Sequence, residues 1–337
     1  MAKLGCLQLC VIYSLSLYYT IQFCFQLLYY YLRGIKFWKI KERRVPPSKI
    51  LMPEVGHHSH IQLKNIKMHY VEAGDKSKPL MVFMHGFPEF WYSWRHQLKE
   101  FHNEYWCVAV DMRGYGDTSK PPKVSDYKIA DIAGDIKELV EALGRKKFIM
   151  IAHDWGGVVG WSFLDLYADM VEKYVIMNAP HTDAWDKLME IDKTQFSKSW
   201  YVIFYQMPYF PELHVSLNDF ELMDDIYAFG PNKVKNEEDI EAYKYTFSKP
   251  GALTPPINYY RNLFTTDPTV KRPVEKEPPG LFIFGDADIA LSVAYVDIMP
   301  QVVPNLKSKI IKGGSHYVQQ DDPVAVNKAM REFLNEN

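Results

Sequence analysis

Hydrophobic positions along this chain form two patterns. The first is a run without a charged residue from Leu4 to Leu32, dominated by Leu, Ile, Val, Phe, Tyr and Cys. The second begins near residue 56, where short apolar runs alternate with segments that have helical spacing. The runs expected to form strands are 61–64, 67–73, 80–84, 106–110, 148–152, 173–177, 281–285 and 309–311.

Helical patterns lie between these strands. One runs from Ile129 to Leu143 and is followed by Gly144, a residue type that commonly ends helices. Another, Pro323–Leu334, closes the chain, and proline suits the first turn of a helix. Strands that alternate with helices indicate a mostly parallel sheet, so the expected fold class is α/β.

The alternation stops between residues 181 and 272. This stretch has no strong strand pattern and holds aromatic and acidic helical segments, such as 237–247, joined by proline-rich connections. A long insertion between strands of an α/β core is typical of a helical cap over the ligand site. The sequence therefore predicts a core of residues 56–180 and 273–337 and a cap of residues 181–272.

The first apolar run predicts a membrane anchor at residues 4–32. As a helix it would extend about 43 Å at 1.5 Å per residue, which exceeds the hydrocarbon core of a bilayer at about 30 Å. Tyr29, Tyr30, Tyr31 and Trp38 suit the membrane interface. A cleaved signal peptide is the competing reading, but the run is too long for one and no small-residue cleavage site follows it.

Basic residues after the run predict its orientation. Six follow it between Arg33 and Arg44, against a lone Glu42, whereas only Lys3 and the amino terminus precede it. The positive-inside rule then places the body of the protein in the cytosol, and the endoplasmic reticulum is the default membrane for such an anchor. Prolines in residues 33–55 mark that stretch as a basic linker.

Composition narrows the function only slightly. The formal net charge is −2, so bulk electrostatics do not favour nucleic acid as a partner. Aromatic residues make up 15% of the chain, which fits either an aromatic core or an aromatic-lined pocket. Cys107 is the one cysteine outside the apolar run, so no disulfide framework or cysteine metal site is expected in the body. His57, His58 and His60 are interpreted as a polar leader in the linker rather than as metal ligands.

The strongest chemical signal lies at residues 148–157. A buried strand pattern stops at Ala152, Asp154 follows after one residue, and Gly156 follows after one more. This small-x-nucleophile-x-small spacing is typical of the nucleophile elbow, a sharp strand-to-helix turn. The central residue is a carboxylate, which can displace at carbon and form an alkyl ester. Asp154 therefore predicts epoxide opening or halide displacement rather than ester hydrolysis.

Other polar residues follow the ends of predicted strands. His85 follows strand 80–84 and Asp111 follows strand 106–110, as Asp154 follows strand 148–152. The carboxyl ends of parallel strands form the ligand-binding edge of such sheets. These side chains are expected at the same edge.

Several motifs together resemble the α/β-hydrolase-fold epoxide hydrolases, most closely the membrane-anchored animal members. The resemblance covers the chain from about Glu54 onward and rests on five segments: His85-Gly86-Phe87-Pro88-Glu89, Asp111-Met112-Arg113-Gly114-Tyr115-Gly116, His153-Asp154-Trp155-Gly156-Gly157, Tyr259-Tyr260-Arg261-Asn262, and His316 with Gln319 and Pro323. It implies an eight-stranded, mostly parallel sheet under a helical cap, with no cofactor and no metal.

The resemblance also implies a histidine base and the acid that orients it. The orienting acid is the third residue after the strand-terminal Gly285, which is Asp288, with Asp286 as its rival. The base is His316, although Ser315 before it and Tyr317 after it depart from the family pattern.

The proton donors and the oxyanion hole follow from the same resemblance. Tyr260 matches the second cap tyrosine of the family, and Tyr201 is favoured over Tyr205 as the first. A tyrosine pair suits an epoxide oxygen, which leaves as an alkoxide. The backbone amides of Phe87 and Trp155 are expected to form the oxyanion hole.

The implied reaction is hydrolysis of lipophilic epoxides to vicinal diols, with water as co-substrate and fatty-acid epoxides as one candidate class. A haloalkane-type dehalogenase with the same Asp-His-Asp set is one alternative. A catalytically silent, membrane-tethered binding protein is the other.

Overall fold

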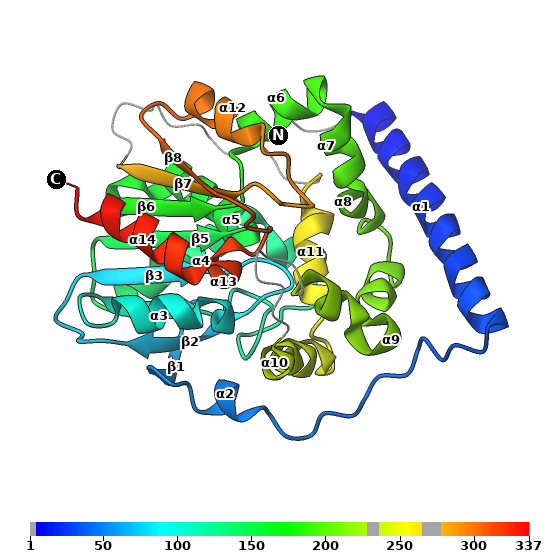
Figure 1. The fold of residues 1–337 in the computed structure, drawn as a ribbon, viewed down its shortest axis with the longest axis horizontal. Coiled ribbons are helices and arrows are strands. Elements are labelled where there is room, and N and C mark those ends of the chain that lie inside the picture. Colours follow the sequence, from blue (N-terminus) through cyan, green and yellow to red (C-terminus); the bar gives the residue numbers. More distant parts are fainter. Residues whose placement is uncertain (1–4, 228–235, 265–277, 337) are drawn as a thin grey trace.

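A mixed sheet of eight strands forms the centre of the molecule (Figure 1). The computed structural model describes residues 5–227, 236–264 and 278–336. The strands are β1 (His57–Gln62), β2 (Lys67–Ala73), β3 (Leu80–Met84), β4 (Trp106–Val110), β5 (Phe148–His153), β6 (Val171–Met177), β7 (Gly280–Gly285) and β8 (Lys307–Ile311). Their order is β1-β2-β4-β3-β5-β6-β7-β8.

The pairing confirms the predicted sheet. β2 pairs antiparallel with β1 and β4, and the other neighbours pair in parallel. Every residue of β3, β4, β5 and β7 is buried, which explains their continuous apolar runs, since helices cover both faces of a parallel sheet. The carboxyl ends of β3, β4, β5, β6 and β7 all meet at one edge.

Helices flank the sheet on both sides (Figure 1). They are α3 (Arg95–Phe101), α4 (Ile129–Ala142), α5 (Trp155–Tyr167), α12 (Tyr295–Val302), α13 (Val318–Asp321) and α14 (Pro323–Leu334), with short 3-10 turns η1 (Trp91–Trp94), η2 (Val124–Tyr127) and η3 (Ala168–Met170). The last helix has the predicted bounds. Gly144 follows α4 with φ +75°, a left-handed conformation that favours glycine at the end of a helix.

Helices fill the described part of the stretch between β6 and β7. They are α6 (Thr182–Ile191), α7 (Lys193–Lys198), α8 (Trp200–Phe204), α9 (Phe210–Ile226), α10 (Glu237–Ser248) and α11 (Thr254–Asn262). α9 is broken at 217–220, where the backbone leaves helical geometry. The last residues of the predicted cap, from 265 on, lie outside the described residues.

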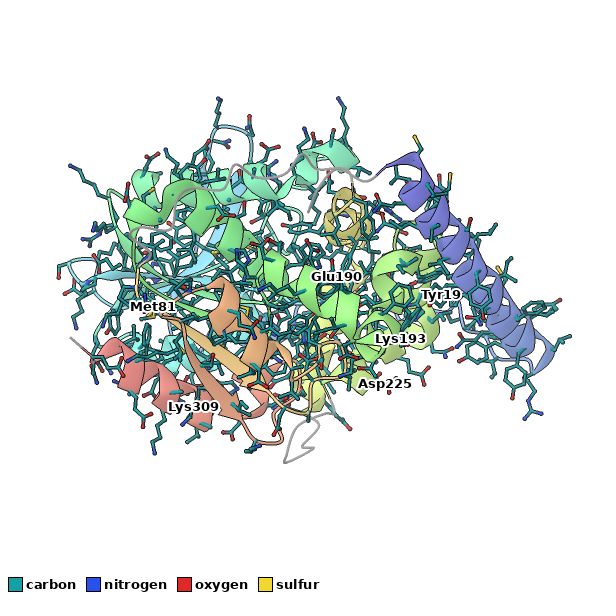
Figure 2. All side chains as sticks on the ribbon, turned by 90° about the horizontal axis from the view of Figure 1, so that it is seen from above. Tyr19, Met81, Glu190, Lys193, Asp225 and Lys309 are labelled. Atoms are coloured by element: carbon teal, nitrogen blue, oxygen red, sulfur yellow. The ribbon has the colours of Figure 1, made fainter. Side chains whose placement is uncertain are left out.

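The N-terminal helix α1 (Cys6–Leu32) lies alongside the cap rather than apart from it (Figures 1 and 2). The Ser16 hydroxyl donates to the carbonyl oxygen of Ile203 in α8 at 2.7 Å. The ring of Phe23 lies 5.5 Å from that of Phe204, and the ring of Tyr19 lies 5.9 Å from that of Trp200. This is the one described helix that is long and apolar enough to cross a membrane.

The segment after α1, predicted to be a basic linker, is bound to the cap by ion pairs. The side chain of Arg43 is 2% exposed and pairs with Asp219 at 2.6 Å and Glu241 at 2.9 Å. Lys49 in α2 (Ser48–Leu51) pairs with Asp239 at 3.2 Å. Arg43, which belongs to the basic cluster that predicts the membrane orientation, therefore forms buried ion pairs within the protein.

One correction concerns the three histidines assigned to the linker. They belong to β1, which begins four residues earlier than predicted, at His57. His58 Nδ1 lies 2.7 Å from His69 Nε2, and His69 Nδ1 lies 2.6 Å from Asp111. The prediction failed because three polar histidines hide the alternation of an edge strand, which is visible only in the pairing with β2.

Candidate active site

Asp154 occupies a strained turn between β5 and α5. Its backbone has φ 50° and ψ −121°, a positive φ that non-glycine residues rarely adopt. Such strain persists where the surrounding structure imposes it, and it concentrates at functional sites. The turn lifts the Asp154 carboxylate above the end of the sheet, as the elbow spacing predicts.

Glycines allow the chain to cross itself at this turn. A Cβ atom on Gly156 would lie 2.2 Å from the carbonyl oxygen of Met84, and one on Gly86 would lie 2.2 Å from Asp154 Oδ1. Any side chain at either position would therefore displace β3 or the carboxylate itself. This is the physical reason for the small residues that flank the elbow.

His316 lies between two carboxylates. Its Nδ1 is 2.7 Å from Asp288 Oδ2, and its Nε2 is 3.3 Å from Asp154 Oδ2. The three side chains come from the loop after β8, the loop after β7 and the elbow after β5. The sheet therefore brings together the predicted Asp-His-Asp set at its carboxyl edge.

The structure places Asp288, rather than its rival Asp286, against the histidine. Asp288 Oδ1 accepts the backbone N–H groups of Ala290 and Leu291 at 2.7 and 2.9 Å. Asp286 points outward, pairs with Lys312 at 3.1 Å and accepts the N–H of Gly313 at 2.6 Å.

Asn178 is a site residue that the sequence analysis missed. It follows β6 with φ 42°, and its side-chain amide donates to Asp288 Oδ2 at 2.7 Å. Its Oδ1 accepts the N–H of Gly285 at 3.2 Å. Asn178 thus fixes the orienting carboxylate, and its position directly after a buried strand was the available signal.

One of the two amides predicted for the oxyanion hole contacts the carboxylate of Asp154. The Phe87 N–H donates to Asp154 Oδ1 at 2.7 Å. Trp155 opens helix α5, so its backbone amide belongs to the N-terminal turn, where N–H groups have no partner within the helix. Both residues also line cavities that reach Asp154.

Tyr201 in α8 and Tyr260 in α11 face each other above Asp154. Their ring centroids are 5.9 Å apart, and both rings line the same two cavities as Asp154 and His316. Burial and then the charge of Asp154 raise the pKa of each phenol, so both stay protonated donors.

The neighbouring tyrosines have less contact with these two cavities. Tyr205 lines one of the two cavities, and the charge that adds to burial in raising its pKa is that of Glu212 rather than Asp154. The hydroxyl of Tyr259 donates to the carbonyl oxygen of Arg113 at 2.7 Å. Tyr201 and Tyr260 line both cavities with Asp154, whereas Tyr205 lines one and Tyr259 lines neither, which favours the predicted pair.

Two cavities meet at Asp154, Tyr201, Tyr260 and His316. The first, of about 80 Å³, is lined chiefly by Trp155, Val158, Ala179, Pro180, Trp185, Val202, Leu263 and Leu291. The second, of about 190 Å³, is lined chiefly by Phe87, Pro88, Lys198, Trp200, Tyr205, His214, Leu222, Ile226 and Ile289. We call these the first arm and the second arm.

The charges of the site favour an ionised Asp154 beside a protonated His316. Burial opposes ionisation of Asp154, but the His316 hydrogen bond and charge and the Phe87 N–H hold its pKa below the usual range. Burial lowers the pKa of His316, yet Asp288 and Asp154 together raise it well above the ordinary value. In the described residues, no group of three or more His, Cys, Asp or Glu side chains is arranged to hold a metal ion.

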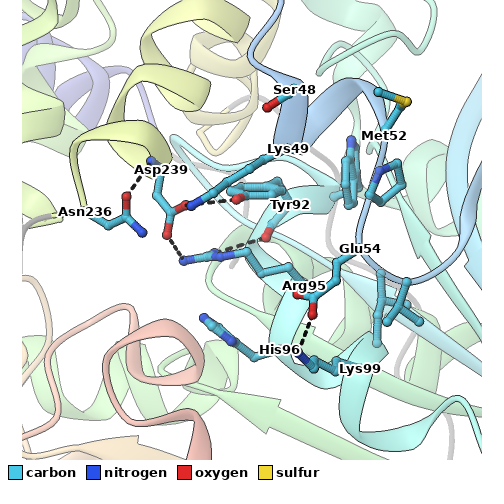
Figure 3. Close-up of a pocket in the computed structure, with 14 residues that line it drawn as sticks. Ser48, Lys49, Met52, Glu54, Tyr92, Arg95, His96, Lys99, Asn236 and Asp239 are labelled. Carbon is cyan, nitrogen blue, oxygen red and sulfur yellow. Dashed lines mark hydrogen bonds and ion pairs between the residues drawn. The ribbon is translucent and has the colours of Figure 1, made fainter.

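A surface cavity of about 420 Å³ lies away from these arms, where linker, core and cap meet (Figure 3). Asp239 of α10 contacts three groups there: Lys49 at 3.2 Å, the Tyr92 hydroxyl at 2.9 Å and Arg95 at 2.9 Å. Arg95 also donates to Gln320 Oε1 at 2.8 Å. The charged groups that line this cavity, Lys49, Arg95 and Asp239, are thus already paired with protein groups.

Comparison with known proteins identifies the class. The sequence profile of the alpha/beta hydrolase fold family matches residues 79–323. The chain is 41% identical over 329 residues to Epoxide hydrolase 1 of Caenorhabditis elegans, covering 95% of this chain and 80% of that protein. It is 39% identical over 303 residues to human Epoxide hydrolase 4, covering 87% and 83%.

Solved structures agree. An epoxide hydrolase variant from Bacillus megaterium superposes with a TM-score of 0.74 at 29% identity, covering 82% of this chain and 100% of that chain. An epoxide hydrolase from Vigna radiata gives a TM-score of 0.70 at 30% identity, covering 83% and 98%.

The fold, the elbow and the profile match make this chain a member of the α/β-hydrolase family. Its relatives place it more narrowly, and the chain belongs to the epoxide hydrolases of that family. The resemblance stated from the sequence motifs is therefore confirmed.

Proposed function

We propose that this enzyme hydrolyses lipophilic epoxides to vicinal diols through a covalent ester on Asp154. The observation that carries the mechanism is a carboxylate at a strained elbow, 2.7 Å from the Phe87 N–H and 3.3 Å from His316. Epoxide hydrolases are also the relatives of the chain, and one solved Bacillus megaterium structure contains a naphthyloxy-propanediol product.

In the first half-reaction, an oxygen of Asp154 attacks one epoxide carbon and the ring C–O bond breaks. Tyr201 and Tyr260 hold the ring oxygen, and one phenol gives its proton to the developing alkoxide. The product is a hydroxyalkyl ester of Asp154.

In the second half-reaction, His316 takes a proton from water and the hydroxide attacks the carboxyl carbon of Asp154. The Phe87 and Trp155 amides stabilise the oxyanion. The C–O bond between the carboxyl carbon and the diol oxygen then breaks as His316 returns its proton to that oxygen, and the acid proton left on Asp154 restores the phenol deprotonated in the first half-reaction. Asp288 holds the imidazole in the tautomer that leaves Nε2 free.

Esterification also prepares the base. The Asp154 charge is one cause of the raised pKa of His316. Alkylation removes that charge, so the pKa of His316 falls when a neutral imidazole is needed.

Isotope labelling tests the route. In a single turnover in heavy-oxygen water with enzyme in excess, heavy oxygen should enter Asp154 and not the diol. His316→Gln should trap the ester as an Asp154 peptide heavier by the mass of the epoxide. Heavy oxygen in the first-turnover diol, with no mass-shifted peptide, would assign direct attack by water.

The dehalogenase alternative shares Asp154, His316 and Asp288 and is separated by the leaving group. A halide leaves without a proton, whereas the two protonated phenols above Asp154 suit an alkoxide. A panel of epoxides and haloalkanes tests this directly, because turnover of haloalkanes alone would reverse the assignment.

The two arms support an epoxide inside a longer molecule. Asp154 lines both arms, so a substrate whose epoxide lies over Asp154 can extend a chain into each. Both arms are largely apolar, which suits lipid chains. Comparing terminal with internal epoxides of one chain length tests this, and a strong preference for terminal epoxides would contradict it.

Membrane attachment through α1 is supported by the large apolar side chains that the helix exposes. Leu7, Leu17 and Phe25 are exposed, whereas Ser16, Thr20 and Phe23 are buried toward the cap. Apolar side chains on the outer side of a helix suit contact with lipid, and Gln8, Gln22 and Gln26 are exposed among them.

The contacts between α1 and the cap limit how the helix can be oriented relative to the membrane. Ser16 and Phe23 are near the middle of the helix, so a helix that crossed the bilayer with these contacts intact would carry α8 into the hydrocarbon layer. The contacts therefore favour a helix lying in the membrane interface over the spanning anchor expected from the sequence.

Tags at both ends distinguish the two arrangements. With intact microsomes, protease should remove an N-terminal and a C-terminal tag alike if α1 lies in the interface. An N-terminal tag protected until detergent is added would establish a spanning anchor with a cytosolic body. Protection of both tags would reverse the predicted orientation.

A further inference from the structure

The two arms of the active site differ in charge. Asp154 and His316 belong to both. Beyond this shared centre, the described residues of the first arm include no cationic side chain, whereas the second arm includes Lys198. An arm built for an alkyl chain alone has no need of an ammonium group.

Lys198 lacks a carboxylate partner in the described part of the chain. It lies at the end of α7 and is half-buried, and its Nζ donates to the carbonyl oxygens of Asp288 and Leu291, each at 2.9 Å. An ammonium has three N–H groups, so these two bonds leave one for another acceptor. The carbonyl dipoles position the ammonium but do not neutralise its charge.

Other buried cations at the cap are compensated. Arg43 pairs with Asp219 and Glu241, and Lys244 pairs with Asp224. The half-buried Lys198 differs from these residues, because it lines a cavity without a counter-ion and so leaves its ammonium charge free to bind an anion.

A second polar group in the same arm is also unsatisfied. The Nδ1 atom of His214 is buried and has no hydrogen-bond partner among the described residues. Buried polar atoms without a partner are uncommon and often meet a ligand or a water molecule. The His214 ring lines the second arm, and an arm whose ammonium has no carboxylate partner suits the charged end of a substrate.

We propose that Lys198 binds the carboxylate of an epoxy fatty acid that lies in the second arm, with the epoxide over Asp154 and the alkyl end in the first arm. This inference rests on the proposed function and names the substrate class of that site. The free acid, rather than its ester or a neutral oxide, is then the preferred form.

Binding of the substrate carboxylate at Lys198 would also fix which epoxide carbon Asp154 attacks. With the carboxylate held at Lys198, the two epoxide carbons become inequivalent relative to Asp154, because one always lies toward the second arm. A single direction of attack follows for a given positional isomer, and a neutral ester of the same acid loses that preference.

Paired substrates test the proposal on the full-length protein. The value of kcat/KM is measured for a mid-chain epoxy fatty acid and for its methyl ester, with wild type, Lys198→Met and Lys193→Met. Lys193 starts the same helix, is exposed and lines neither arm, so it is the matched control (Figure 2).

The expected result is a change in the acid-to-ester ratio. We expect Lys198→Met to lower this ratio about tenfold, the equivalent of about 1.4 kcal/mol, chiefly through KM for the acid. Lys193→Met should leave it unchanged, and Lys198→Arg should retain most of it. Dividing the acid-to-ester ratio of kcat/KM for each variant by the same ratio for wild type cancels differences in solubility and partitioning between acid and ester.

Other outcomes overturn the proposal. An equal loss with both substrates would assign Lys198 a structural role through the Asp288 carbonyl. A wild-type ratio that Lys198→Met does not change would remove the carboxylate site.

Failure of the proposed function is distinguishable by a binding measurement. Calorimetry with a saturated fatty acid and its methyl ester needs no turnover. Tighter binding of the acid by wild type than by Lys198→Met would support the site even in a protein that hydrolyses no epoxide, and equal binding would reject it. If Lys198→Met does not fold, Lys198→Gln is used in the same comparison.

Discussion

The carboxylate of Glu89 lies 2.6 Å from Nδ1 of His153, and both side chains are fully buried behind the catalytic loop. The other ring nitrogen of His153 lies 2.7 Å from the carbonyl oxygen of His316. Glu89 also accepts from the Gly86 N–H at 3.0 Å. One carboxylate therefore holds both the loop of the oxyanion hole and, through His153, the backbone of the base.

This relationship predicts the behaviour of Glu89→Gln. Burial opposes ionisation of Glu89, but His153 holds its pKa below the usual range, so the substitution removes a charge from a buried pair. We expect a loss of about 1.5–3 kcal/mol in the free energy of unfolding, measured by denaturant titration, because the buried donors around residue 89 lose a charged acceptor. At temperatures where the variant is folded, kcat should fall while KM for the epoxide changes little.

A positioning role for Glu89 has its own signature. Both half-reactions should slow in single-turnover kinetics, since Phe87 and His316 are displaced together. A variant that loses stability but retains both rates would limit Glu89 to holding the fold.

The cap contact at Asp239 gives a second prediction. Asp239→Asn weakens the bonds to Arg95, Tyr92 and Lys49 (Figure 3), of which the Arg95 bond is partly buried. Hydrogen bonds to charged groups contribute about 1.5–3 kcal/mol each, so we expect a lower Tm and faster proteolysis within the cap. Asp225→Asn, on the exposed surface of α9, is the control and should change neither. Equal protease sensitivity of the two variants would show that Asp239 does not hold the cap.

The two cap tyrosines give a third prediction. Tyr201→Phe and Tyr260→Phe each remove one hydroxyl donor above Asp154, and each should lower the rate of ester formation about 10²–10³-fold. The double variant should form no measurable ester but should remain folded by circular dichroism. Tyr205→Phe is the comparison variant, because Tyr205 lines only the second arm, whereas Tyr201 and Tyr260 line both. If Tyr205→Phe is slow and Tyr201→Phe is not, the first donor is Tyr205.

Much of this arrangement could be predicted from the sequence because it is local. The strand ending before Asp154 and the flanking small residues lie within ten positions, and backbone crossing at Gly156 requires that pattern. The order of Asp288 and His316 after β7 and β8 follows from the topology of the sheet.

The residues that were missed act across long separations in sequence. Asn178 contacts Asp288, and Glu89 contacts His153, through pairs that no local pattern joins. The packing of α1 on the cap has the same cause, since Ser16 and Ile203 are far apart in the chain. In the sequence, nothing distinguishes Lys198 from an ordinary surface lysine. Only the structure shows that it lines the second arm.

The last prediction concerns the charge shared by Asp154 and His316. Asp154→Asn removes one of the two carboxylates that raise the pKa of His316 and so imitates the neutral ester. The pKa of His316, followed by NMR of its ring protons with His316→Gln as the assignment control, should be lower in Asp154→Asn than in wild type. The sign of the stability effect follows. A histidine whose pKa is raised on folding contributes stability that is fully present below its unfolded pKa of about 6.5 and is lost as the pH rises through the folded pKa. The Tm of wild type relative to Asp154→Asn should therefore be highest near pH 6, should decline as the pH rises toward the folded pKa of His316 in wild type, and should lose the His316 contribution above it. A difference in Tm that stays constant across this range, with an unchanged His316 pKa, would mean that Asp154 does not control the base, and that esterification does not release it for the second half-reaction.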